Sequence, residues 1–237
     1  MADNETMITA NIALIAFFGG LFPSLLWLWF WLREEHCHHN PKRYILAAFI
    51  GGMVAVPLVL PLQHLAATYF SGVMVVILWA AAEEVLKFLA AYVTVLRPRM
   101  MDAPIDPLIF MISTALGFAA LENAFFLIDP IRDGGAIQAL LTGNLRFIGA
   151  TLLHTLTSAT VGFGVAYAFY RRKFIQRWVL ALSLVLAIAL HSIFNFLIIE
   201  GNQGGMMQAF LFVWVGIILL LLLFEKVKAR SNTECTF

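Results

Sequence analysis

Long apolar runs separated by short polar joints dominate the pattern of the chain. An α-helix that crosses the hydrocarbon core of a bilayer needs about 20 apolar residues. Seven runs come close to or exceed that length: residues 8–32, 44–65, 72–96, 108–128, 145–170, 178–199 and 206–224. We therefore predict an all-α fold, a polytopic transmembrane bundle of about seven helices. No joint is long enough for a separate folded domain, so residues 1–237 are expected to form a single integral membrane domain.

The composition supports a lipid environment. Hydrophobic residues make up 62% of the chain and charged residues 12%, and the mean hydropathy is +0.88. A soluble domain is typically about 45–50% apolar and about 25% charged. The surplus of apolar side chains cannot all be buried inside a water-soluble fold of this size. The net charge of +1 gives no indication of a nucleic-acid partner.

The basic residues predict the orientation in the membrane, because cytoplasmic loops collect Lys and Arg. Twelve of the fifteen basic residues fall in alternate joints or at the C-terminal end: Arg33, Lys42, Arg43, Arg97, Arg99, Arg171, Arg172, Lys173, Arg177, Lys226, Lys228 and Arg230. This asymmetry predicts an outside N-terminus and a cytoplasmic C-terminus. Cys37 and Cys235 would then both face the reducing side, where a disulfide is not expected.

Four of the runs contain ionisable or amide side chains at membrane depth. A charged residue at the bilayer centre costs about 2.5–3.5 kcal/mol on insertion scales. Such groups must face one another or water, and they are typical of functional sites. They are Glu83, Glu84 and Lys87 in run 72–96, Glu122 and Asn123 in run 108–128, Arg146 and His154 in run 145–170, and His191 and Asn195 in run 178–199.

The spacing of these groups predicts how they meet. At 1.5 Å per residue, His154 lies about 15 Å and His191 about 12 Å from the outer ends of their helices. All can share one layer in the outer half of the membrane if the four helices are neighbours, with the other three helices as outer supports. Glu83 and Lys87 are four residues apart, so Lys87 is expected to neutralise part of the acidic pair. Adjacent Glu83 and Glu84 diverge by about 100° and are expected to differ in role.

The residue types are those of a hydrolytic metal site. Two imidazoles and one carboxylate form a three-ligand zinc site that leaves a position for water. A further glutamate near that water can act as general base. Lys87 and Asn195 could donate hydrogen bonds to the developing oxyanion, and His191 and Asn195, four residues apart, can point into one cavity. The ligands come from separate helices, and there is no His-Glu-x-x-His motif.

Glu83-Glu84-x-x-Lys87, Phe118-x-x-x-Glu122-Asn123, His154 and His191-x-x-x-Asn195 resemble the PrsW family of bacterial intramembrane metalloproteases, and more distantly the CAAX prenyl proteases. Each motif alone is weak, whereas four in order on consecutive helices, over about residues 80–196, are much more specific. Glu122 stands where the prenyl proteases have His. A prenylated substrate is therefore not expected, and whether Glu122 binds metal stays open.

The resemblance implies an endopeptidase that uses zinc or another divalent metal, with a catalytic core at about residues 72–199. It implies Glu83 or Glu84 as base and His154 with His191 as metal ligands, Glu122 being a further candidate. The implied partner is a membrane-anchored protein such as an anti-sigma factor, cut near its extracytoplasmic boundary in regulated, stress-responsive proteolysis. The implied location is the bacterial inner membrane, which the chain crosses several times.

Other interpretations of the same residues stay open. A proton- or ion-coupled transporter could use the Glu, Lys and His cluster as a relay, although no inverted repeat is evident. A receptor without chemistry would not need these groups at one depth. Glu84 and Lys87 could form a structural ion pair, His154 and Asn195 could join helices by hydrogen bonds, and Arg146 is expected to snorkel to the interface. The histidine-rich stretch at residues 34–39 lacks a second ligand cluster, so no functional metal is predicted there.

Overall fold

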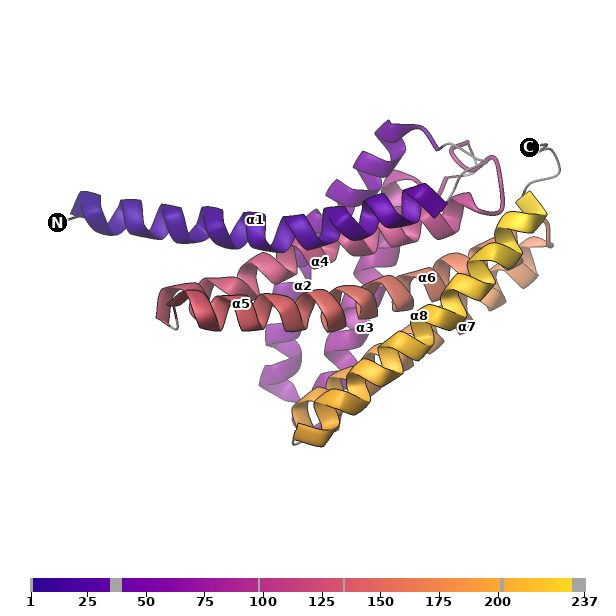
Figure 1. Ribbon diagram of the computed structural model, residues 1–237. Helices are drawn as coiled ribbons and strands as arrows, with labels where there is room; N and C mark the ends of the chain where they lie inside the picture. Colours follow the sequence, from indigo (N-terminus) through magenta and orange to yellow (C-terminus); the bar gives the residue numbers. More distant parts are fainter. Residues whose placement is uncertain (1, 35–39, 98, 134, 201–202, 232–237) are drawn as a thin grey trace.

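The computed structural model describes residues 2–34, 40–97, 99–133, 135–200 and 203–231, and these residues form helices and short connections without a strand (Figure 1). The histidine-rich residues 35–39 lie outside the described part. One π-helical turn, Arg146–Ala150, joins α5 to α6. The α-helices are α1 (Ala2–Glu34), α2 (Lys42–Tyr69), α3 (Val73–Thr94), α4 (Asp106–Asp133), α5 (Gly135–Leu145), α6 (Thr151–Tyr167), α7 (Lys173–Glu200) and α8 (Gln203–Ser231).

The predicted seven-helix organisation is confirmed, since α5, the π turn and α6 are continuous and correspond to one run. Six helices in the described residues are long and apolar enough to cross a membrane. The remaining helix is α3, whose apolar sequence is interrupted by Glu83, Glu84 and Lys87. The joint predicted at 129–144 is largely helical instead. Gly135 there has a φ of +68°, which glycine adopts readily, so the chain can reverse without a long loop.

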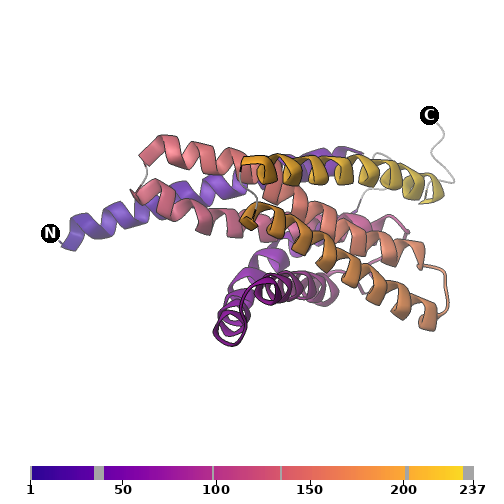
Figure 2. The same ribbon diagram turned by 90° about the horizontal axis from the view of Figure 1, so that it is seen from below.

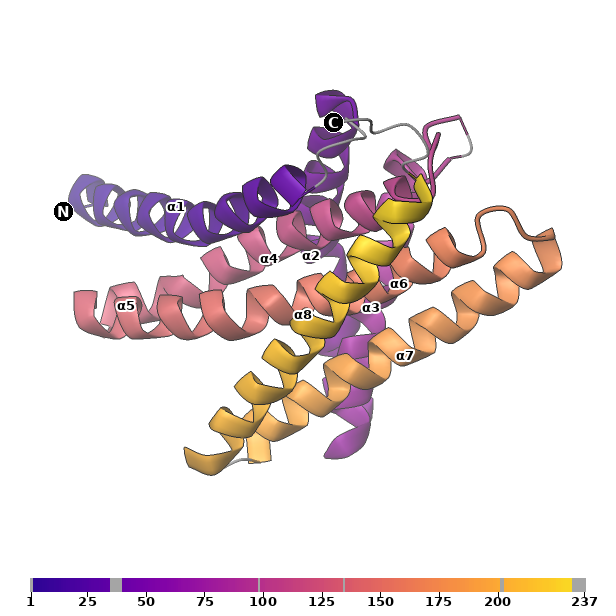
Figure 3. The ribbon, with the colours of Figure 1, turned by 45° about the vertical axis from the view of Figure 1, so that its right-hand side comes forward.

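Helix α4 lies at the centre of the bundle and packs against α1, α2 and α6. Its residues 106–120 are all buried, which a helix reaches only when neighbours cover every face. Figure 2 shows α2 and α3 as a pair on one side of α4 and α6, with α8 on the opposite side. Figure 3 shows α7 and α8 diverging from the end at which they meet, and both contact α6.

Two glycines let α2 and α4 approach until their backbones touch. A Cβ atom on Gly52 would collide with the backbone oxygen of Thr114, and one on Gly117 would collide with the backbone of Phe49. Small residues commonly permit such contact between membrane helices. This crossing sets where α2 lies relative to the half of α4 that carries Glu122.

The helices that carry the candidate site residues are neighbours, as the prediction required. Helix α3 contacts α4, α6 and α7, and α6 contacts both α4 and α7. The expectation that the second run is only an outer support is wrong, because α2 packs on α3 and places Gln63 against Glu83. Five helices therefore contribute side chains around the site.

Candidate metal centre

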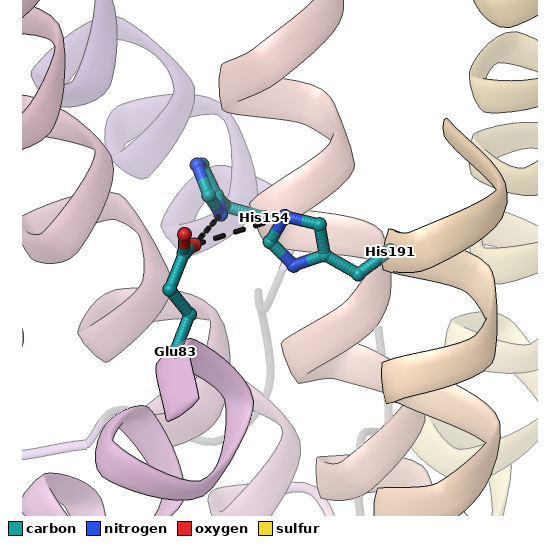
Figure 4. Close-up of side chains that lie close together, drawn as sticks. All are labelled: Glu83, His154 and His191. Carbon is teal, nitrogen blue, oxygen red and sulfur yellow. Dashed lines mark ion pairs between the residues drawn. The ribbon is translucent and has the colours of Figure 1, made fainter. Parts of the chain in front are cut away.

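Glu83, His154 and His191 come together from α3, α6 and α7, and all three are buried (Figure 4). The Oε2 atom of Glu83 lies 4.0 Å from Nδ1 of His154 and 3.7 Å from Nε2 of His191. Each residue offers one potential ligand atom, and these atoms lie within 4.8 Å of one another. The structure therefore brings the two histidines together with Glu83, one member of the acidic pair.

One carboxylate oxygen and two imidazole nitrogens are a donor set that fits a divalent metal. The Oε2 atom of Glu83 is buried and has no hydrogen-bond partner among the described residues. An unpartnered buried carboxylate oxygen is costly. Oε2 of Glu84 is unpartnered as well, but Oε2 of Glu83 faces the nitrogens of two imidazoles, which makes it the candidate metal ligand. Zinc binds such atoms at about 2.0–2.2 Å, which requires only a small contraction of the three side chains.

His191 is held by Glu84 on the side away from Glu83. Its Nδ1 atom lies 2.7 Å from Oε1 of Glu84. When Nδ1–H donates to this carboxylate, Nε2 carries the lone pair and faces Glu83. Histidines that bind metals commonly donate their other ring N–H to a carboxylate in this way.

His154 is held in the same manner by Glu122. Its Nε2 atom lies 2.9 Å from Oε2 of Glu122, so Nε2–H donates and Nδ1 keeps its lone pair. Nδ1 faces Oε2 of Glu83 and also lies 3.1 Å from Nζ of Lys87. Both histidines thus present an unprotonated nitrogen to the same carboxylate oxygen.

Lys87 neutralises part of the acidic pair, as the spacing predicted, and it does so through Glu84. Its Nζ atom lies 2.6 Å from Oε1 of Glu84, and both side chains are fully buried. The same oxygen accepts hydrogen bonds from Thr157 at 2.9 Å and from His191. Lys87 thus neutralises one member of the acidic pair, while Glu83 points toward α2, α6 and α7. The structural ion pair considered for Glu84 and Lys87 is present.

Gln63 of α2 is a site residue that sequence reasoning missed. Its Nε2 atom donates to Oε1 of Glu83 at 2.8 Å, and Trp79 donates to its backbone oxygen at 2.9 Å. The sequence feature that could have identified Gln63 is its amide within the apolar run 44–65, since a polar side chain at membrane depth needs a partner. Thr157, three residues after His154, was also missed, although it too is a polar side chain within an apolar run.

Arg146 does not snorkel. Its Nη2 atom lies 2.5 Å from Oε2 of Glu122, its Nε donates to Oδ1 of Asn123 at 2.6 Å, and its side chain is 17% exposed. Glu122 therefore contacts the far nitrogen of His154 and lies beside the group of three, not within it. Asn195 is half-buried one turn after His191, and its side chain makes no hydrogen bond to any described residue.

Comparisons with known proteins find relatives over most of the chain. Residues 40–223 match the profile of a family described as PrsW family intramembrane metalloprotease. The chain is 27% identical to Protease PrsW of Halalkalibacterium halodurans over 211 residues, covering 86% of this chain and 91% of that protein. It is 27% identical to Protease PrsW of Geobacillus kaustophilus over 192 residues, covering 79% and 81%. It is 26% identical to Protease PrsW of Bacillus subtilis over 185 residues, covering 76% and 81%. No solved structure matches the chain.

Proposed function

Because the chain belongs to the PrsW family of intramembrane metalloproteases, we propose that it cuts a membrane-anchored protein at the site formed by Glu83, His154 and His191. Family membership, together with six helices in the described residues that are long and apolar enough to cross a membrane, makes it a multi-pass membrane protein and an intramembrane protease. The observation that carries the site assignment is the Oε2 atom of Glu83, which is buried without a hydrogen bond and faces both imidazoles.

Glu83 is the reacting carboxylate of the acidic pair. A divalent metal at this site would supply Lewis acidity toward a peptide carbonyl and toward water. Glu83 can serve as third ligand through Oε2, or as base toward a water held between Oε2 and the two imidazoles. Its other oxygen is held by Gln63, which keeps Oε2 aimed at His154 and His191. Glu84 positions Lys87 and His191 through its Oε1 atom, which accepts three hydrogen bonds.

Lys87 and Asn195 are assigned to the developing oxyanion. An ammonium group has three N–H donors, and Lys87 directs one of them at Oε1 of Glu84. A second lies within reach of Nδ1 of His154, and it would be released when that nitrogen binds a metal. The donors that Glu84 does not hold are then available to a substrate oxygen in a buried site, where such hydrogen bonds are strong. The amide of Asn195 lies one turn from His191 and has no hydrogen-bond partner among the described side chains, so it can donate to substrate.

The proposed substrate is a membrane-anchored protein such as an anti-sigma factor, cut near its extracytoplasmic boundary. Support comes from the family resemblance and from the positive charges, which predict that the outer half of the membrane contains the site. The chain would then act in regulated intramembrane proteolysis during a stress response.

The metal content of detergent-purified protein tests the site directly. Wild type is expected to hold about one zinc per chain, and His154→Ala/His191→Ala is expected to lose it. A matched control, His36→Ala/His38→Ala/His39→Ala, removes the other histidine cluster and is expected to keep the metal. Loss of metal in the control alone would contradict the assignment. An active wild type without metal would leave Glu83 as base in a metal-independent hydrolase and overturn the metal assignment.

A further inference from the structure

Arg146 opens the π-helical turn that precedes His154. The backbone N–H of Thr151 bonds to the carbonyl of Arg146, five residues back. On a regular α-helix, residues eight apart differ by about 80° around the axis, at about 100° per residue. A π turn takes up one extra residue, which reduces this difference to about 20°. Arg146 and His154 therefore face α4 together, and π turns are frequent at functional sites.

Both side chains converge on one oxygen of Glu122. Oε2 of Glu122 lies 2.5 Å from Nη2 of Arg146 and 2.9 Å from Nε2 of His154. The guanidinium also bonds to Oδ1 of Asn123 at 2.6 Å and lies over the ring of Phe126 at 3.9 Å. These contacts leave the guanidinium little freedom, so the position of the carboxylate is fixed as well.

We propose that Arg146 is a positioning residue that acts on His154 through Glu122. By holding Glu122, it keeps Oε2 where it accepts the Nε2–H of His154, and the opposite nitrogen then points at Glu83. Arginine suits this role because its planar fork reaches Glu122 and Asn123 together, which a lysine ammonium does not. This inference rests on the proposed function, since it assumes that Nδ1 of His154 works in the site.

Without Arg146, the Glu122 carboxylate has His154 as its single side-chain partner among the described residues. It can then rotate about its own side chain, and the ring of His154 loses its fixed orientation. Groups that orient a metal-binding histidine typically change metal affinity about 10–100-fold when mutated. Arg146→Met keeps the apolar stem of the side chain and removes the charge, so it tests this effect.

A double-mutant cycle on zinc affinity decides whether Arg146 acts through Glu122. Zinc affinity is measured by chelator competition for wild type, Arg146→Met, Glu122→Leu and the double variant. We expect Arg146→Met to weaken binding about 10–100-fold, and the double variant to bind no worse than Glu122→Leu alone. The double variant also removes both charges, so it leaves no unpaired ion to prevent folding. Arg146→Lys should recover part of the affinity.

The control is Arg132→Gln, since Arg132 pairs with Asp129 and Asp133 and its side chain is 58% exposed. It should bind zinc like wild type. Additive losses in the double variant, or wild-type affinity in Arg146→Met, would overturn the inference.

A wild type that binds no zinc would contradict the metal assignment and still leave Arg146 testable. The ring N–H of His154 is then followed by nitrogen-edited NMR and assigned by its absence in His154→Ala. A proton held by a carboxylate resonates far downfield. Loss of that shift in Arg146→Met, with recovery in Arg146→Lys, would support the inference, and an unchanged shift in Arg146→Met would overturn it.

Discussion

The Oε1 atom of Glu84 lies 2.7 Å from Nδ1 of His191, and the two side chains are almost completely buried. The neighbouring Glu83 faces the other nitrogen of the same ring, at 3.7 Å. His191 is therefore bracketed by two adjacent glutamates with different partners. The Oε2 atom of each glutamate is buried without a hydrogen bond among the described residues, but Oε1 of Glu84 accepts three hydrogen bonds and Oε2 of Glu83 faces both imidazoles. This difference predicts that the two glutamates respond differently to mutation.

Glu83→Gln should abolish cleavage while the protein stays folded. The amide keeps the size of the side chain and can still accept the hydrogen bond from Gln63, but it cannot act as a base or as a strong metal ligand. Loss of a general base typically slows a reaction about 10²–10⁴-fold. The measurement is cleavage of a co-expressed membrane-anchored substrate, with thermal unfolding in detergent as the control for folding. Wild-type cleavage by Glu83→Gln would remove Glu83 from the mechanism.

Glu84→Leu should instead destabilise the fold. It leaves the ammonium of Lys87 buried without its carboxylate partner, and breaking a buried ion pair costs about 3–5 kcal/mol. The companion variant Glu84→Leu/Lys87→Met removes both charges and should recover most of the stability without recovering cleavage. Thermal unfolding and the yield of folded protein measure the effect. If Glu84→Leu unfolds at the wild-type temperature, the ion pair does not stabilise the bundle.

The membrane helices and the cluster of polar residues could be predicted from the sequence. Apolar runs of the required length identify the helices, because lipid permits few alternatives for a backbone that must satisfy its own hydrogen bonds. The positions of His154 and His191 along their helices also predicted a common depth, since each residue advances a helix by a constant rise.

The individual pairings could not be predicted, because they depend on how each helix is rotated about its axis. Both glutamates are within reach of Lys87 by spacing, and the packing of α3 against α2 and α7 directs Glu83 away from it. The contact between Gln63 and Glu83 depends on the α2–α3 pair. Arg146 was expected to snorkel because it lies near an interface, and its contact with Glu122 depends on a π turn that the sequence did not reveal.

The natural cysteines test the predicted orientation. If the C-terminus and the joint after the first helix are cytoplasmic, Cys37 and Cys235 should both resist a membrane-impermeant maleimide in intact spheroplasts. Both should react after the membrane is permeabilised. Single variants, Cys37→Ser and Cys235→Ser, assign the signal to each site. Labelling of either cysteine in intact spheroplasts would contradict the predicted topology. It would also contradict the proposed extracytoplasmic cleavage site, which depends on that topology.

Gly117→Ala should lower both stability and cleavage, although Gly117 is not itself a residue of the site. Its added methyl group would meet the backbone of Phe49 on α2, which cannot move aside as a flexible side chain can. Overpacking of this kind typically costs about 1–3 kcal/mol. Separating α2 from α4 would also shift Gln63 relative to Glu83, so cleavage should fall further than the folded fraction does.

Gly143→Ala is the matched control for this substitution. It also adds a methyl group to a helical glycine, but its nearest neighbour would be a Leu127 side-chain atom at 3.8 Å, an ordinary contact. We expect it to unfold at the wild-type temperature or slightly above, because alanine favours a helix more than glycine does. Thermal unfolding in the same detergent compares the two. Equal unfolding temperatures for Gly117→Ala and wild type would mean that the α2–α4 crossing can relax, and that the position of Gln63 depends on α3 alone.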